Sequence, residues 1–94
     1  MEWQLRKAMV AIGREIHARG LVAASDGNLS ARLGDERVLI TPSGVSLGHL
    51  RTASMVVIDH RGRQLAGDAR PSSEYRLHLA VYAERADVQA VVHA

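Results

Sequence analysis

Three short polar segments of this sequence have the composition of an anion-binding site. Residues 27–30 read GNLS, residues 41–44 read TPSG, and residues 71–74 read PSSE. Glycine lets a ligand come close to the backbone, and short hydroxyl or amide side chains can donate hydrogen bonds to a phosphate. Each segment alone is also an ordinary loop sequence, because loops are rich in these residue types. Three of them in one small chain predict a phosphate cradle, provided that the fold brings them together.

The segment at 71–74 is also the predicted start of a helix, which we expect over residues 73–86. Pro71 is excluded from a helix interior, whereas the hydroxyls of Ser72 and Ser73 can cap free N–H groups of a first turn. The positive end of the helix dipole favours an anion, and Glu74 fits the same field. Two interpretations therefore stand for this segment alone: a capped helix with an acidic first turn, or one wall of an anion site.

The histidines do not show the spacing of a metal site. His93 lies in a strand predicted at 88–94, where a lone histidine is more often a hydrogen-bonded core residue than a metal ligand. We interpret the other four as surface or incidental residues: His17, His49, His60 and His78. The chain has no cysteine, which excludes disulfides and cysteine-based zinc sites.

The composition predicts a single domain over residues 1–94. Hydrophobic residues make up 47% and aromatic residues only 3%, so the core must be built mainly from aliphatic side chains. The net charge of +2 is spread without a basic run, which argues against a nucleic-acid partner. No apolar run approaches the ~18 residues of a membrane span, and residues 1–4 lack the pattern of a signal peptide. We therefore expect a cytoplasmic protein with no membrane partner.

Hydrophobic periodicity predicts how these segments are positioned. A first helix is expected over 2–19, with an apolar stripe of Leu5, Ala8, Met9, Ile12 and Ile16. Alternation predicts a hairpin with strands at 28–33 and 37–41 and a turn at 34–36. Further strands are expected at 55–59, 64–66 and 88–94, and a loop with a short helical turn at 45–54. The helix at 73–86 has a modest stripe of Leu77, Ala80, Val81 and Glu84.

These elements predict an α/β fold in which both helices pack on a largely antiparallel sheet. Short turns between neighbouring strands force antiparallel pairing, because a parallel crossover needs a dozen or more residues.

Four motifs occur together in the order and rough spacing of a known family. They are the segments at 27–30, 41–44 and 71–74, and AVVH at 90–93. With them the whole chain resembles the class II aldolase/adducin family, and it is most similar to the fuculose-phosphate aldolase and ribulose-phosphate epimerase group. The resemblance implies a three-layer α/β/α fold with a mixed, mostly antiparallel sheet.

The resemblance also implies a role for each matched position. The substrate's phosphate would be held by Asn28, Ser43, Gly44, Ser72 and Ser73. Ser43 stands where some relatives carry threonine, which keeps the hydroxyl. Glu74 would be the acid/base that moves the proton on the carbon next to the carbonyl. His93 would be the first of three zinc-binding histidines.

The implied activity is retro-aldol cleavage of a phosphorylated sugar. The cleavage leaves an enediolate, and Zn²⁺ or another divalent metal stabilises its charge through the carbonyl and hydroxyl oxygens. A Schiff base would be the other route, but the only lysine, Lys7, lies on the first predicted helix.

The family's domain is roughly twice as long, so the chain resembles its N-terminal half. The second histidine of the family lies two residues after the first, and this sequence ends at Ala94. A catalytic zinc site normally takes three protein ligands, so we expect this chain alone to bind zinc weakly and to lack aldolase activity. We also expect residues 88–94 to leave an apolar sheet edge that favours association, and the resembling enzymes are homotetramers.

Two alternatives remain open at the level of sequence. The chain could be a non-catalytic assembly module, as in the adducin head, although the presence of Glu74 and His93 favours an enzyme. The same fold could also carry an epimerase, a dehydratase or a decarboxylase that acts on a related phosphate.

Overall fold

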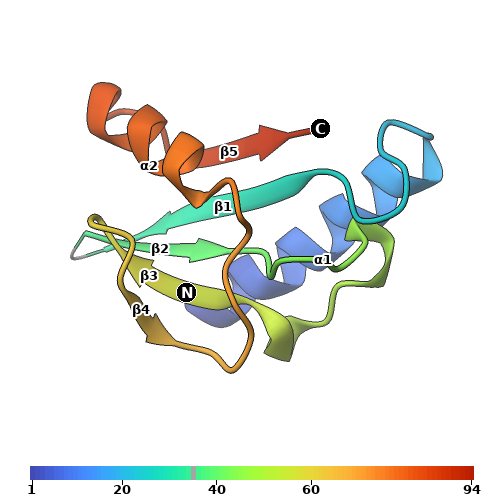
Figure 1. Ribbon diagram of the computed structural model, residues 1–94, viewed down its shortest axis with the longest axis horizontal. Helices are drawn as coiled ribbons and strands as arrows, with labels where there is room; N and C mark the ends of the chain where they lie inside the picture. The colour runs from blue at the N-terminus through green and yellow to red at the C-terminus, as the bar shows by residue number, and fades with distance from the viewer. Residues whose placement is uncertain (35) are drawn as a thin grey trace.

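The computed structural model describes residues 1–34 and 36–94 and forms three layers (Figure 1). The elements are α1 (Glu2–Ala18), β1 (Asn28–Leu33), β2 (Arg37–Ile40), the 3-10 helices η1 (Leu47–His49) and η2 (Thr52–Ser54), β3 (Val56–Asp59), β4 (Gln64–Ala66), α2 (Tyr75–Glu84) and β5 (Ala90–His93). The strand order is β4-β3-β2-β1-β5. The α/β prediction is confirmed. All four strand pairings are antiparallel, so the described part of the sheet is not mixed.

The strand positions agree closely with the sequence pattern. In β1 and β2 the hydrophobic alternation sets the register, with Ser30 opposite Ile40 and Arg32 opposite Val38. The predicted turn at 34–36 contains Asp35, which lies outside the described residues. The strand predicted at 88–94 is shorter and pairs with β1 at the edge of the sheet.

Each face of the sheet has its own hydrophobic core. Met9 and Ile16 of α1 pack with Leu39 in one core, and Tyr82 of α2 packs with Val38 and Ile40 in the other. Successive residues of β2 thus point to opposite faces, as the pleat requires. The two helices cover opposite sides of the sheet and complete the α/β/α layers.

The predicted apolar stripes of both helices need correction. In α1, Ile12 is 46% exposed, and the buried positions include Val10 and Gly13 instead. Gly13 is buried because η1 lies against it: a Cβ there would be 2.5 Å from the carbonyl oxygen of Leu47.

In α2 the predicted stripe faces outward, with Leu77 44% exposed. The buried positions are His78 and Tyr82. The long-range contacts of α2 set its buried side, and they combine the hydrogen bonds of His78 with the packing of Tyr82 on the second core.

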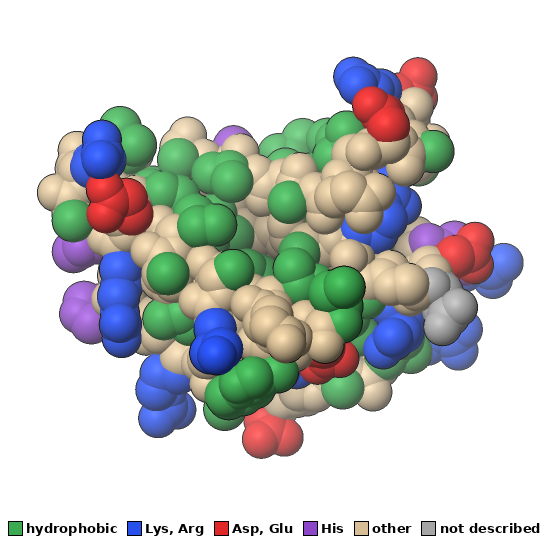
Figure 2. Space-filling view, turned by 180° about the vertical axis from the view of Figure 1, so that it is seen from behind, with side chains coloured by type: hydrophobic (Ala, Val, Ile, Leu, Met, Phe, Trp, Pro, Cys, Tyr) green, Lys and Arg blue, Asp and Glu red, His purple; other side chains and the backbone are tan. Residues whose placement is uncertain are grey.

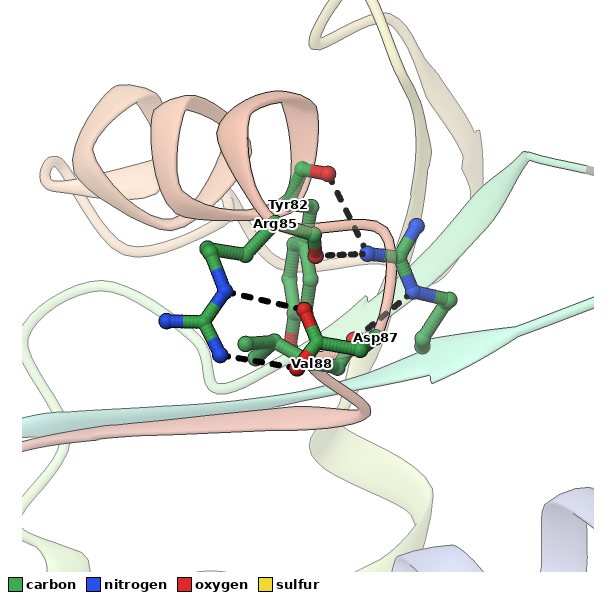
Figure 3. A network of polar contacts seen from close by, with 5 residues as sticks. Tyr82, Arg85, Asp87 and Val88 are labelled. Atoms are coloured by element: carbon green, nitrogen blue, oxygen red, sulfur yellow. Dashed lines mark hydrogen bonds and ion pairs between the residues drawn. The ribbon is translucent and has the colours of Figure 1, made fainter.

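Arg32 of β1 links the end of α2 to the segment that precedes β5, in the network that includes Tyr82, Arg85 and Val88 (Figure 3). Its guanidinium donates to the carbonyl oxygens of Tyr82, Arg85 and Val88, and it lies 4.6 Å from the centre of the Tyr82 ring. The last carbonyls of a helix have no partner within it, so a cation at this end both caps α2 and offsets its dipole. β5 is thereby held beside β1.

On the side of the molecule shown in Figure 2, hydrophobic side chains gather near the centre and charged side chains lie mainly around them. An apolar groove between α1 and β5 is lined by residues that include Leu5, Ile12 and Val92. Among the described residues, no helix has both the length and the hydrophobicity needed to cross a lipid bilayer.

Candidate active site

The three polar segments meet in one pocket of about 320 Å³. Its lining residues are Ser25, Asp26, Gly27, Asn28, Pro42, Ser43, Gly44, Ser72, Ser73 and Glu74. All five residues expected to hold a phosphate lie in this pocket. Asn28 and Ser72 are buried, whereas Ser43, Gly44 and Ser73 are exposed. The site therefore has buried donors in its wall and accessible ones at its mouth.

Backbone hydrogen bonds hold the three segments together. The amide N–H of Ser72 donates to the carbonyl of Thr41, and that of Ser43 donates to the carbonyl of Arg70, both at 2.9 Å. The hydroxyl of Thr41 accepts a hydrogen bond from the N–H of Leu29 at the start of β1. Thr41 is almost fully buried, so it links the pocket segments from the core side.

Two glycines give the pocket its backbone shape. Gly27 and Gly44 have φ angles of +87° and +75°, which ordinary side chains rarely adopt. Gly27 is also confined, since a Cβ would lie 2.7 Å from Cγ1 of Val22. The space beside Gly44 is open, with nothing within 4 Å of a Cβ. Gly44 therefore leaves the backbone accessible to a ligand.

The two serines before α2 form a turn and do not cap the helix as predicted. The Ser72 carbonyl accepts the N–H of Tyr75, and the Ser72 hydroxyl accepts the N–H of Glu74. α2 therefore begins at Tyr75, after the turn, with Glu74 as its flanking residue. Ser73 stays exposed at the mouth of the pocket. Among the described residues, the N–H groups of Ser73 and Gly44 have no hydrogen-bond acceptor.

Glu74 lines the pocket and contacts His93, which lies beside the pocket and does not line it. A carboxylate oxygen of Glu74 lies against Nδ1 of His93, and each side chain is nearly half exposed. The two atoms lie within ion-pair distance, but Nδ1 of His93 makes no hydrogen bond within the described residues. β-Pairing explains the position of His93, because it lies directly opposite Asn28.

His93 fits part of a metal site. Its Nδ1 is a buried nitrogen without a hydrogen bond, which is the kind of atom that a metal ion can satisfy. Within 1–34 and 36–94, no three histidine, aspartate or glutamate side chains lie close enough to hold a metal ion. His93 can thus act as one ligand, beside a carboxylate, of a metal whose other ligands do not come from these residues.

The interpretation of His78 as an incidental residue is wrong: its side chain is fully buried, beneath the pocket. Its Nε2 is hydrogen-bonded to Oδ1 of Asn28, and its Nδ1 to the hydroxyl of Ser30 at 2.5 Å. That hydroxyl also lies 2.7 Å from the Tyr82 phenol oxygen. Burial lowers the pKa of His78 to about 4, helped by His93 and opposed by Glu74. The imidazole is therefore neutral at neutral pH.

The sequence did contain a signal for this residue. Glu74, His78 and Tyr82 are spaced four apart, which puts them on one side of a helix. The apolar stripe predicts the wrong buried side of α2. Polar residues at helical spacing usually face solvent, so these three residues do not by themselves indicate a buried side.

The charge of the lining residues determines which groups could hold an anion in the pocket. None of its lining residues is lysine or arginine, and Asp26 and Glu74 are acidic. An anion bound here would have to be held by N–H and O–H donors instead of by a cationic side chain.

The chain matches the sequence profile of the family described as "Class II Aldolase and Adducin N-terminal domain" over residues 7–94. It is 44% identical over 88 residues to 3-oxo-tetronate 4-phosphate decarboxylase of Haemophilus influenzae, covering 94% of this chain and 41% of that protein. Over 93 residues it is 43% identical to methylthioribulose-1-phosphate dehydratase of Methylococcus capsulatus, covering 98% and 45%. Over 89 residues it is 45% identical to 5-methylthioribulose-1-phosphate/5-deoxyribulose-1-phosphate aldolase of Rhodospirillum rubrum, covering 95% and 39%. The chain thus spans less than half the length of these relatives.

Solved structures show the same fold. YgbL of Klebsiella pneumoniae, described provisionally as an aldolase/epimerase/decarboxylase, superposes with a TM-score of 0.94 at 41% identity, covering 99% of this chain and 44% of that one. An L-fuculose 1-phosphate aldolase superposes with a TM-score of 0.89 at 30% identity, covering 97% and 43%.

Proposed function

Because the chain belongs to the class II aldolase and adducin family, we propose that it forms the phosphate-binding and proton-transfer part of a lyase that acts on a phosphorylated sugar. The observation that carries this proposal is the convergence of the three polar segments on one pocket, with Glu74 of the pocket in contact with His93 beside it. A pocket that resulted only from loose packing between loops would not require so many hydrogen-bond donors without an acceptor among the described residues.

The phosphate binds at the mouth of the pocket. Ser43 and Ser73 contribute hydroxyls, and the N–H groups of Gly44 and Ser73 are free to donate among the described residues. Asn28 and Ser72 add donors from the wall. Hydrogen bonds to a charged group are stronger than neutral ones, so several donors can hold an anion without lysine or arginine. Holding this remote phosphate orients the carbon atoms that react.

Glu74 moves the proton on the carbon next to the carbonyl. The side chain is nearly half exposed, so it can reach a substrate anchored at the neighbouring serines. In a dehydration it would take this proton, and in an aldol cleavage or a decarboxylation it would return one to the same carbon. One carboxylate in one place therefore serves all three reactions named for the relatives.

A divalent metal such as Zn²⁺, with His93 as one ligand, would supply stabilisation of the negative charge that develops on the substrate's oxygens. Glu74 beside His93 keeps the proton-transfer group next to that charge. Within this class we favour retro-aldol cleavage of a sugar phosphate, with dehydration or decarboxylation as the alternative chemistry.

Assembly into a homo-oligomer is part of the same proposal. β5 forms one edge of the described sheet, and Val92 on it is 57% exposed. Apolar sheet edges favour association with a further chain or segment.

The proposal is tested by measuring turnover of phosphorylated ketoses and of 3-oxo acid phosphates by the protein that carries this chain. Products of aldol cleavage, loss of water and loss of carbon dioxide are followed in parallel, with and without added Zn²⁺. We expect one of these reactions to proceed and to be inhibited competitively by inorganic phosphate. Absence of all three reactions, together with no phosphate binding, would contradict the proposal.

A further inference from the structure

A chain of buried hydrogen bonds runs from the second core to the pocket. It links the Tyr82 phenol, the Ser30 hydroxyl, the His78 imidazole and the Asn28 amide. Each of these four residues is at most 6% exposed. Only Asn28 also lines the pocket, so the chain ends at a group that a ligand can reach.

The direction of these hydrogen bonds follows from their chemistry. The amide oxygen of Asn28 can only accept, so Nε2 of His78 carries the proton and donates it to Oδ1. In a neutral imidazole the other nitrogen then accepts, so the Ser30 hydroxyl donates to Nδ1. The Ser30 oxygen is left to accept from the Tyr82 phenol. Each of the three hydrogen bonds in the chain thus has one donor and one acceptor.

We propose that His78 is a positioning residue that orients the Asn28 amide, so that its Nδ2 group is presented to an anion in the pocket. This inference rests on the proposed function, because it assumes that the anion is a phosphate held partly by Asn28. With Oδ1 bound to His78, the remaining donors of the amide belong to Nδ2, which makes no hydrogen bond to any other described residue.

The orientation matters because an asparagine amide has nearly the same shape after a half-turn. With the amide reversed, Oδ1 would face the pocket and repel an anion already flanked by Asp26 and Glu74. No cationic side chain lines the pocket to offset that repulsion. His78 selects one orientation of the Asn28 amide, since a neutral imidazole protonated at Nε2 can donate a hydrogen bond to Oδ1 but not to Nδ2.

Two substitutions separate this role from general packing. The amide nitrogen of glutamine can replace the donor Nε2 of histidine, whereas the amide oxygen of asparagine can replace the acceptor Nδ1. His78→Gln therefore keeps a donor for Asn28, and His78→Asn keeps a partner for Ser30 but leaves Asn28 without one. Each variant loses one of the two buried hydrogen bonds, so their folding stabilities should fall by similar amounts.

The protein that carries this chain is titrated with inorganic phosphate, and binding is monitored through the ¹⁵N-detected signals of its side-chain amides. Loss of one hydrogen bond to a charged group predicts phosphate affinity about tenfold weaker in His78→Asn. We expect His78→Gln to restore most of the wild-type affinity. Equal affinities in the two variants would overturn the proposal.

The ¹⁵N shifts of the His78 ring give a second readout that needs no variant. We expect the tautomer protonated at Nε2 and unprotonated at Nδ1, and the opposite tautomer would overturn the proposal even if His78→Asn fails to fold. Ser43→Ala separates this inference from the proposed function. If Ser43→Ala weakens phosphate binding and His78→Asn does not, the positioning role alone is wrong. If Ser43→Ala and Asn28→Asp both leave binding unchanged, the phosphate site itself is wrong, and the positioning role with it.

Discussion

The carboxylate of Glu74 lies against Nδ1 of His93, which joins the turn before α2 to the edge strand β5. The pairing of β5 with β1 places His93 directly opposite Asn28, which lines the same pocket as Glu74. A carboxylate that lines a polar pocket, in contact with an imidazole, is suited to proton transfer beside a bound metal. The first prediction follows from this contact.

Glu74→Gln should lower turnover by at least about a hundredfold, the usual contribution of a general acid or base. The amide keeps the size of the side chain but cannot accept a proton. Metal content, measured by atomic absorption, should not fall, because His93 is unchanged. Glu84→Gln is a matched control at the exposed far end of α2. Turnover equal to wild type in Glu74→Gln would remove Glu74 from the mechanism.

Ser43→Ala should weaken binding of inorganic phosphate and of substrate by about tenfold or more, because a hydrogen bond to a charged group is lost. The effect should fall mainly on KM, since the proposed function places Ser43 at the phosphate and not at the carbon that exchanges a proton with Glu74. Calorimetric titration with phosphate gives the affinity directly. Ser54→Ala is the control, because among the described residues the Ser54 hydroxyl bonds only to the backbone of Arg51, the residue before η2, and Ser54 does not line the pocket. A Ser43→Ala protein with unchanged phosphate affinity would count against this use of the pocket.

Gly27 and Gly44 provide a matched pair for the backbone. Both have positive φ, so alanine at Gly44, where nothing lies within 4 Å, should cost only about 1–2 kcal/mol of unfolding free energy. Alanine at Gly27 should cost about 2–4 kcal/mol, because its Cβ would also meet Val22 at 2.7 Å. Urea denaturation of both variants checks the order. A larger loss at Gly44 than at Gly27 would contradict the strain argument.

The sequence predicted the sheet better than the helix faces. Strands β1 and β2 follow from alternation and turn residues, because side chains of a strand point to its two faces in strict succession. Strand β3 follows from a nearly continuous apolar run, which is typical of a strand buried on both faces. The faces of α1 and α2 depended on tertiary partners that periodicity does not show. Ile12 is exposed because η1 packs elsewhere on α1, against Gly13.

The candidate site could likewise be predicted only in part from the sequence. Composition alone indicates the three polar segments as candidates. Their convergence on one pocket depends on the backbone hydrogen bonds between residues 41–43 and 70–72. The buried role of His78 depends on Asn28 and Ser30, about fifty residues earlier in the chain. The spacing of Glu74, His78 and Tyr82 indicates one side of α2, but it does not identify Asn28 and Ser30 as the partners of His78.

The last prediction concerns pH. Burial, helped by His93, lowers the pKa of His78 to about 4 in the folded protein, from 6.5 in the unfolded chain. Between these values the unfolded chain binds more protons at this site than the folded protein does, so folding stability must rise with pH there.

The stabilisation from neutral His78 should therefore be complete above pH 6.5 and be lost as the pH falls from 6.5 towards 4. The difference between the two pKa values corresponds to at most about 3 kcal/mol. Urea denaturation from pH 4 to pH 7.5 measures this loss, and His78→Gln is the comparison because glutamine does not titrate. We expect the stability difference between wild type and His78→Gln to shrink by up to this amount on acidification. A difference that stays constant over this range would show that His78 titrates alike in the folded and unfolded states, which a fully buried, doubly hydrogen-bonded neutral imidazole does not allow.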